Sequence, residues 1–82
     1  MLQETNTQIG HDLLKMAHET ADSGSEVFAS VFGIGRLWVH KVEFMDDKPL
    51  IAKVFCWSGS DGKSVSWLIP LAAVRGVMSE DR

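Results

Sequence analysis

The chain has 82 residues, of which 45% are hydrophobic and 23% charged, a composition typical of one small globular domain and not of a disordered chain. Its net charge of −3 comes without any block of lysines and arginines, which argues against binding to duplex DNA. The single cysteine excludes a disulfide within the chain and favours a reducing compartment.

The ends of the chain are polar and carry no targeting pattern. The first residues lack the basic region and apolar run of a secretory signal, and no apolar run approaches the roughly 18 residues that span a membrane. We therefore predict one cytoplasmic domain over residues 1–82 without membrane contact, frayed at residues 1–6 and 79–82.

Residues 7–22 carry the spacing of an amphipathic helix, with apolar side chains recurring at i, i+4 and i+7/8. The predicted apolar stripe consists of Ile9, Leu13, Leu14, Met16 and Ala17. Gly24 can adopt the left-handed conformation that ends many helices, so we expect the helix to stop there.

Residues 25–32 fit two structures. Val27 and Val31, like Phe28 and Phe32, are four residues apart, which suits a short second helix. The same β-branched and aromatic content equally suits a buried strand. We favour the helix, because the glycines that follow would end it and turn the chain into a sheet.

Residues 36–70 hold three apolar-rich runs separated by two turn signals, so we predict a three-stranded antiparallel meander. The stronger signal is Asp61-Gly62, which is typical of a two-residue hairpin. The expected register pairs Trp38 with Cys56, Val42 with Ala52, Phe44 with Leu50 and Cys56 with Trp67. The inward face then holds Trp38, His40, Val42, Phe44, Leu50, Ala52, Val54, Cys56, Val65, Trp67 and Ile69.

The opposite face of this meander collects five large apolar side chains: Leu37, Val39, Phe55, Trp57 and Leu68. Such a patch exceeds what a soluble monomer usually exposes, so we expect something to cover it. The cover is either intrachain, by residues 27–32 or by residues 71–78 closing the sheet into a small barrel, or it is another chain. In the second case the five residues form an interface with a second copy or with a different protein.

The same register places Lys41 directly opposite Lys53, a repulsive pair unless an anion lies between them. With Phe55 and Trp57 beside them, the two lysines also fit a module that binds single-stranded nucleic acid by stacking and by phosphate contacts. We keep this function as the alternative to protein binding.

No recognised catalytic or metal-binding pattern occurs in the sequence. His11 and His18 are two helical turns apart, about 10.5 Å, which is too far for two ligands of one metal ion. Cys56 and His40 share the predicted inward face, but a buried and inert thiol is the favoured interpretation. We therefore predict no enzymatic activity, no cofactor and no metal.

Residues 64–77, SVSWLIPLAAVRGV, resemble the end of small SH3-like barrels, where a strand, one helical turn and a last strand follow each other. This likeness names no family. The predicted fold is α+β, with an N-terminal helix and a short second helix packed on a three-stranded meander that the C-terminal segment would close into a small barrel. The predicted function is that of a small non-enzymatic accessory or inhibitory protein, which binds a partner or itself through the outer sheet face.

Overall fold

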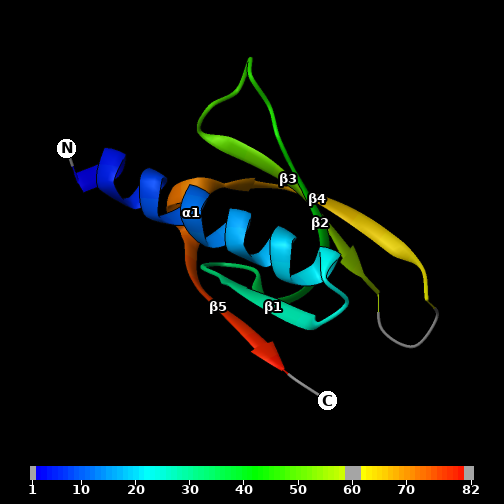
Figure 1. Cartoon of the computed structure of the whole chain (residues 1–82). Coiled ribbons are helices and arrows are strands. Elements are labelled where there is room, and N and C mark those ends of the chain that lie inside the picture. The colour runs from blue at the N-terminus through cyan, green and yellow to red at the C-terminus, as the bar shows by residue number, and fades with distance from the viewer. Residues whose placement is uncertain (1, 59–61, 81–82) are drawn as a thin grey trace.

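The structure is a computed structural model that describes residues 2–58 and 62–80, and it consists of one helix packed on a five-stranded antiparallel sheet (Figure 1). The elements in chain order are α1 (Leu2–Asp22), β1 (Glu26–Val31), β2 (Gly35–Phe44), β3 (Ile51–Trp57), β4 (Ser64–Pro70), the 3₁₀ turn η2 (Leu71–Ala73) and β5 (Val74–Glu80). The spatial order of the strands is β4-β3-β2-β1-β5.

The α+β class is confirmed, and two of its predicted details are wrong. The sheet has five strands and not three, and it stays open, with β4 and β5 as its two edges. The helical turn and the last strand expected after Pro70 are confirmed as η2 and β5. The predicted Asp61-Gly62 turn falls partly outside the described residues, although Gly62 has the positive φ, 70°, that such a turn requires.

The short second helix expected over residues 25–32 is wrong, because this segment forms strand β1. Its side chains alternate, with Val27 and Ala29 fully buried and Phe28 between them half-exposed. β1 pairs on both sides, with β2 and with β5, so tertiary pairing decided between two local structures that the residues allow equally.

Helix α1 is confirmed, although it begins at Leu2, earlier than expected, and only part of its predicted apolar stripe faces the core. Gly24 follows its end with φ 96°, as predicted. Gly10, Leu14 and Ala17 face the core, whereas Ile9 and Met16 from the predicted stripe are 49% and 57% exposed. The side of the helix that carries Gly10 faces η2, and the small size of this residue permits the close contact.

The backbone of α1 lies very close to the backbone of η2 at Gly10. A Cβ atom at this position would overlap the backbone carbonyl of Leu71 in η2. Glycine is therefore required here for packing and not for its backbone conformation.

Strand β2 contains a β-bulge at His40, which changes the face of every residue before it. Val39 pairs with Cys56 and Lys41 with Phe55, so β2 has one residue more than β3 over this interval. Because side chains alternate along a strand, one extra residue exchanges the two faces. Leu37 and Val39 consequently point into the core.

The hairpin registers also differ from those expected, each by two residues. Phe44 pairs with Ala52 in place of Leu50, and Cys56 pairs with Val65 in place of Trp67. A shift of two residues keeps each side chain on its face. The predicted faces of β3 and β4 therefore remain valid although the pairs do not.

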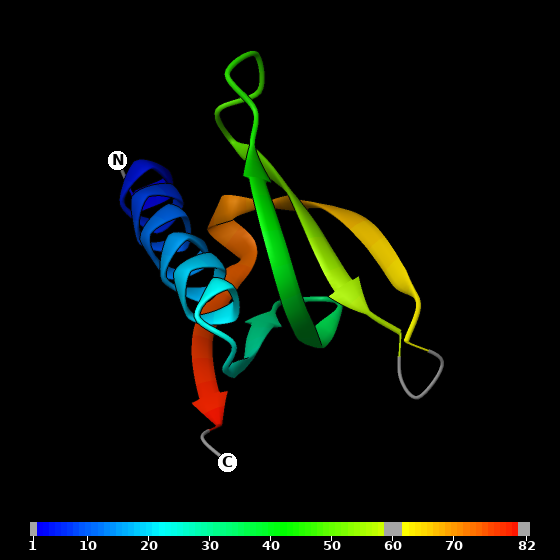
Figure 2. The ribbon, with the colours of Figure 1, turned by 45° about the vertical axis from the view of Figure 1, so that its right-hand side comes forward.

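The helix covers only part of the sheet. It contacts β1, β2, β5 and η2 (Figure 2), and the imidazole of His18 ties it to β2 because His18 Nδ1 accepts a 3.0 Å hydrogen bond from the Val42 N–H group. On the uncovered strand β4, Val65 and Trp67 are 43% and 41% exposed although they lie on the inward face. The buried core consists of Leu14, Ala17, Val27, Ala29, Val31, Leu37, Val39, Val42, Ala52, Val54, Cys56, Ile69, Leu71 and Val74.

Candidate binding surface

The bulge turns the side chain of His40 to the outer face of the sheet, where it stacks on Trp57. The two ring centroids are 4.3 Å apart and the planes are inclined by 28°. His40 Nε2 also shares a 2.7 Å hydrogen bond with Ser64 Oγ of β4. The imidazole therefore joins three strands and holds the indole of Trp57 in place.

On the outer face of the sheet, the Phe55 ring lies near two lysine side chains. The Nζ atoms of Lys41 and Lys53 lie 5.4 and 5.3 Å from the centroid of its ring, within the range of cation–π attraction. In the register, Lys41 is opposite Phe55 and Lys53 is opposite Glu43. The repulsive Lys41–Lys53 pair expected from the sequence is therefore wrong, and Glu43 also lies 3.8 Å from Lys41 Nζ.

Only three of the five residues predicted for the interface lie on the outer face. Trp57 and Leu68 are 37% and 60% exposed, and Phe55 is half-buried between the lysines. Leu37 and Val39 are buried in the core at 9% and 1% exposure, so their predicted position on the outer face is wrong. The sequence gives no signal for the bulge that moves them.

Strand β4 is a second exposed apolar feature, and it includes Val65 and Trp67, which were expected on the covered inward face. It pairs with β3 on one side and with no strand on the other side within the described residues. From Ser64 to Pro70 it has no charged residue. Five consecutive residues from its start, and again Pro70, are exposed, and only Ile69 is buried. The missing charge was the sequence signal that distinguishes this strand from β2 and β3.

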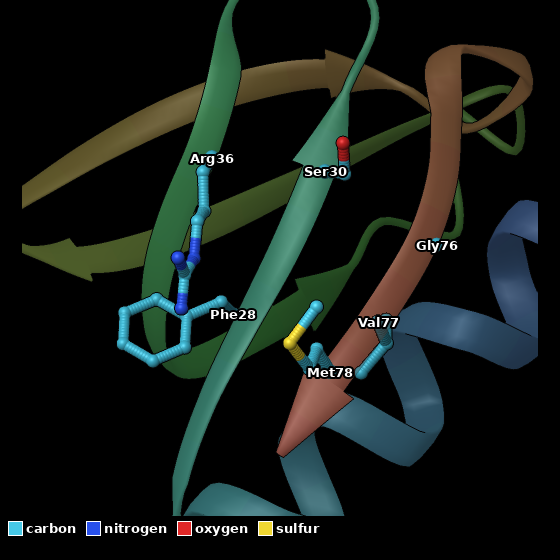
Figure 3. Close-up of a pocket in the computed structure, with 6 residues that line it drawn as sticks. All are labelled: Phe28, Ser30, Arg36, Gly76, Val77 and Met78. Atoms are coloured by element: carbon cyan, nitrogen blue, oxygen red, sulfur yellow. The ribbon is translucent and has the colours of Figure 1, made fainter. Parts of the chain in front are cut away.

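Two hollows in the surface are lined in part by aromatic residues. One, of about 310 Å³, is lined by Ala21, Gly24, Ser25, Glu26, Trp38, Val39, His40 and Trp57. The other, of about 250 Å³, is lined by Phe28, Ser30, Arg36, Gly76, Val77 and Met78 (Figure 3). In the second hollow the Arg36 guanidinium lies 4.0 Å from the centre of the Phe28 ring. The two hollows therefore differ in charge, since the lining of the first contains no lysine or arginine.

The thiol of Cys56 lies on the inner face and is 2% exposed. Burial raises the pKa of this thiol from 9.0 to about 11, which disfavours the thiolate that a nucleophile requires. Because the bulge places His40 on the outer face, the expected shared face of Cys56 and His40 is wrong. The two side chains do not form a nucleophile–base pair in this arrangement.

Among residues 2–58 and 62–80, no group of three or more His, Cys, Asp or Glu side chains could hold a metal ion. In the same part of the chain, no helix combines the length and apolarity needed to cross a membrane. The chain matches no protein-family model, no curated protein and no solved structure.

Proposed function

We propose that this chain is a small non-enzymatic protein-interaction module that binds an extended segment of a partner along the free edge of β4. Phe55, Trp57 and Leu68 would contact the partner on the outer face, and Trp67 on the inner face. An accessory or inhibitory protein is the kind of molecule that such a module suits.

The observation that supports the proposal is the exposure of β4. An edge strand presents a row of backbone N–H and C=O groups that template pairing with another chain, and soluble proteins usually protect such edges with charges or a covering element. Within residues 2–58 and 62–80, β4 has neither, since it contains no charged residue and α1 packs on the other half of the sheet. Addition of a strand at a sheet edge is a common mode of peptide recognition, in which neighbouring side chains supply specificity.

The test compares two residues on the two edge strands. Leu68 on β4 and Met78 on β5 are 60% and 59% exposed, so a lysine at either position should leave the fold intact. We expect Leu68→Lys to abolish capture of a partner from the native host, or self-association measured by light scattering. Met78→Lys should change neither. Equal behaviour of the two variants, or a wild-type monomer that captures nothing, would contradict the proposal.

The same experiment identifies the occupant. Light scattering that gives twice the mass of the chain, reduced to the single mass by Leu68→Lys, indicates a second copy on β4. A single mass with a captured protein that Leu68→Lys releases indicates a different partner.

Single-stranded nucleic acid is the second candidate, and the position of Phe55 between two lysines favours it. A base can stack on an aromatic ring while the amino groups contact phosphates. Glu43 opposes this function, because it faces Lys53 and lies beside Lys41. If the function is correct, a labelled oligothymidylate binds at low salt and is released by the double change Lys41→Glu and Lys53→Glu. If the wild type leaves its fluorescence anisotropy unchanged at low salt, this candidate is excluded.

A further inference from the structure

We propose that the hollow lined by Trp38, His40 and Trp57 recognises a methylated ammonium group, such as the side chain of a trimethylated lysine in a partner protein. This inference rests on the proposed function, because Trp57 belongs to both surfaces. The proposed function concerns the backbone of a partner segment along β4, and this inference specifies one side chain that the partner would carry.

The aromatic rings of the hollow come from two strands and are fixed by other contacts. Trp38 is half-buried and packs against Phe28, with the ring centroids 6.1 Å apart. His40 is held by its stack on Trp57 and by its hydrogen bond to Ser64. Rings that are already in place bind a ligand with little loss of conformational entropy.

The charge around the hollow favours a cation. The carboxylate-bearing residue Glu26 belongs to the lining, as do Ala21, Gly24 and Ser25 at the end of α1. A helix C-terminus carries a partial negative charge, and the last turn of α1 contains no basic residue that would neutralise it. The lining residues themselves include no lysine or arginine, so no permanently cationic side chain competes with a cation for this hollow.

Methylation distinguishes the expected ligand from an ordinary lysine. An unmodified ammonium group is strongly hydrated and needs several hydrogen-bond acceptors when it leaves water. A quaternary ammonium group has no N–H donors, and the faces of tryptophan rings attract it through their quadrupoles. A hollow of about 310 Å³ has room for the trimethylammonium group and the end of its aliphatic stem.

The neighbouring hollow is an internal contrast. It has a similar volume, about 250 Å³, and an aromatic ring, Phe28, but the guanidinium of Arg36 already lies over that ring. A methylated cation should therefore enter the hollow at Trp57 and not the hollow at Phe28. Backbone amide shifts of Ser25 and His40, compared with those of Ser30 and Gly76, distinguish the two positions.

The binding experiment uses three small probes and ¹⁵N-labelled full-length chain. The probes are N-acetyl-trimethyllysine methylamide, the corresponding unmethylated lysine derivative, and the neutral analogue of the first in which a tert-butyl group replaces the trimethylammonium group on the same stem. We expect the trimethylated probe to bind about 10-fold more tightly than either of the others, with shifts around Ser25 and His40. Equal binding of the neutral molecule, or no shifts at about 10 mM trimethylated probe, would overturn the inference.

Variants of two tryptophans with similar exposure provide the controls. Trp57 and Trp67 are 37% and 41% exposed, but only Trp57 lines the hollow. Trp57→Ala should weaken binding of the trimethylated probe about 10-fold, and Trp67→Ala should leave it unchanged. Trp57→Leu keeps an apolar side chain of substantial volume without an aromatic face, so the same loss in this variant shows that the ring and not the fold is responsible. Full binding by Trp57→Leu would overturn the inference.

The two proposals fail separately in these experiments. Leu68→Lys should disrupt the β4 edge while leaving binding of the trimethylated probe intact, because Leu68 is not part of the hollow. A protein that binds the probe but captures no partner retains this inference and loses the proposed function. A protein that captures a partner through Leu68 but ignores the probe loses only this inference.

Discussion

The two halves of the sheet differ in what covers them. The covered half, formed by β5, β1 and β2, packs against α1, and its inward side chains such as Val27 and Val39 are almost completely buried. The open half, formed by β3 and β4, has a buried inner strand but an edge strand on which only Ile69 is buried. Both halves are rich in apolar residues. The difference teaches that apolar content did not decide which half is core.

What decided the covered half is the ability of the helix to approach it. Gly10 allows backbone contact with η2, Ala17 is small enough to be fully buried, and His18 supplies a hydrogen bond to Val42 of β2. The helix presents no comparable contact to β4. The apolar side chains of the open half therefore remain available to another molecule, which is the physical basis of the proposed function.

The largest expected effect on stability comes from truncating a leucine in the covered half, compared with a leucine in the open half. Leu14 on α1 is 0% exposed, and Leu68 on β4 is 60% exposed. Leu14→Ala should lower the free energy of unfolding by about 2–5 kcal/mol, because it leaves a cavity in the core. Leu68→Ala should change it by less than about 0.5 kcal/mol. Urea unfolding followed by circular dichroism measures both, and equal losses would show that the open half is covered in solution.

A second prediction tests the close contact that defines the covered half. Alanine usually stabilises an exposed helix position by about 1 kcal/mol relative to glycine. At Gly10 we expect the reverse, a loss of about 3 kcal/mol, because the added Cβ would overlap the Leu71 carbonyl. Gly76→Ala on β5 is the control, since a Cβ at Gly76 meets no atom within 4 Å. Stabilisation by Gly10→Ala in urea unfolding would mean that α1 stands further from η2.

Cys56 lies at the boundary between the two halves, since it pairs with the buried Val39 on one side and with the exposed Val65 on the other. Its titration therefore reports whether water reaches the core at this boundary. Its pKa is raised by burial from 9.0 to about 11. A group whose pKa is higher in the folded chain stabilises the fold fully below its unfolded pKa and loses this contribution as the pH rises to its folded pKa. The stability of the wild type relative to Cys56→Ala should thus fall by on the order of 2 kcal/mol between pH 9.0 and about 11.

The pH dependence of this difference is measured by urea unfolding of both proteins over the same range. A difference that does not change with pH would mean that water reaches the thiol through the open half.

The smallest expected effect concerns the hydrogen bond that ties α1 to β2. His18→Leu leaves the Val42 N–H group without its acceptor in a partly buried position, which should cost about 1–2 kcal/mol. His18→Asn offers an oxygen near the place of Nδ1 and should restore part of the loss. Amide hydrogen exchange at Val42 should accelerate in His18→Leu. Unchanged exchange would show that the contact does not hold the helix over the bulge.

Much of the scaffold followed from local patterns. The helical spacing predicted α1, Gly24 predicted its end, and Pro70 with the residues after it predicted η2 and β5. The outer positions of Phe55, Trp57 and Leu68 were also predicted correctly, because the hairpin registers differ by two residues and a shift of two preserves the face.

The candidate surface was predicted less completely, because one residue in β2 changes it. The bulge at His40 moves Leu37 and Val39 into the core and brings His40 out to Trp57. A bulge depends on how two strands pair, and no local pattern in this chain encodes it. The hollow at Trp57 could not be predicted for the same reason.

The sequence by itself determined the α+β class, the position of the helix, the alternation along β3 and β4, and the uncharged character of β4. These properties depend on spacing and turn chemistry within a few residues. Only the tertiary structure decided that residues 26–31 are a strand, that Gly10 faces the core and that β4 stays uncovered. Each of these depends on which backbone approaches which, and such distances are set by the packing of segments that lie far apart in the chain.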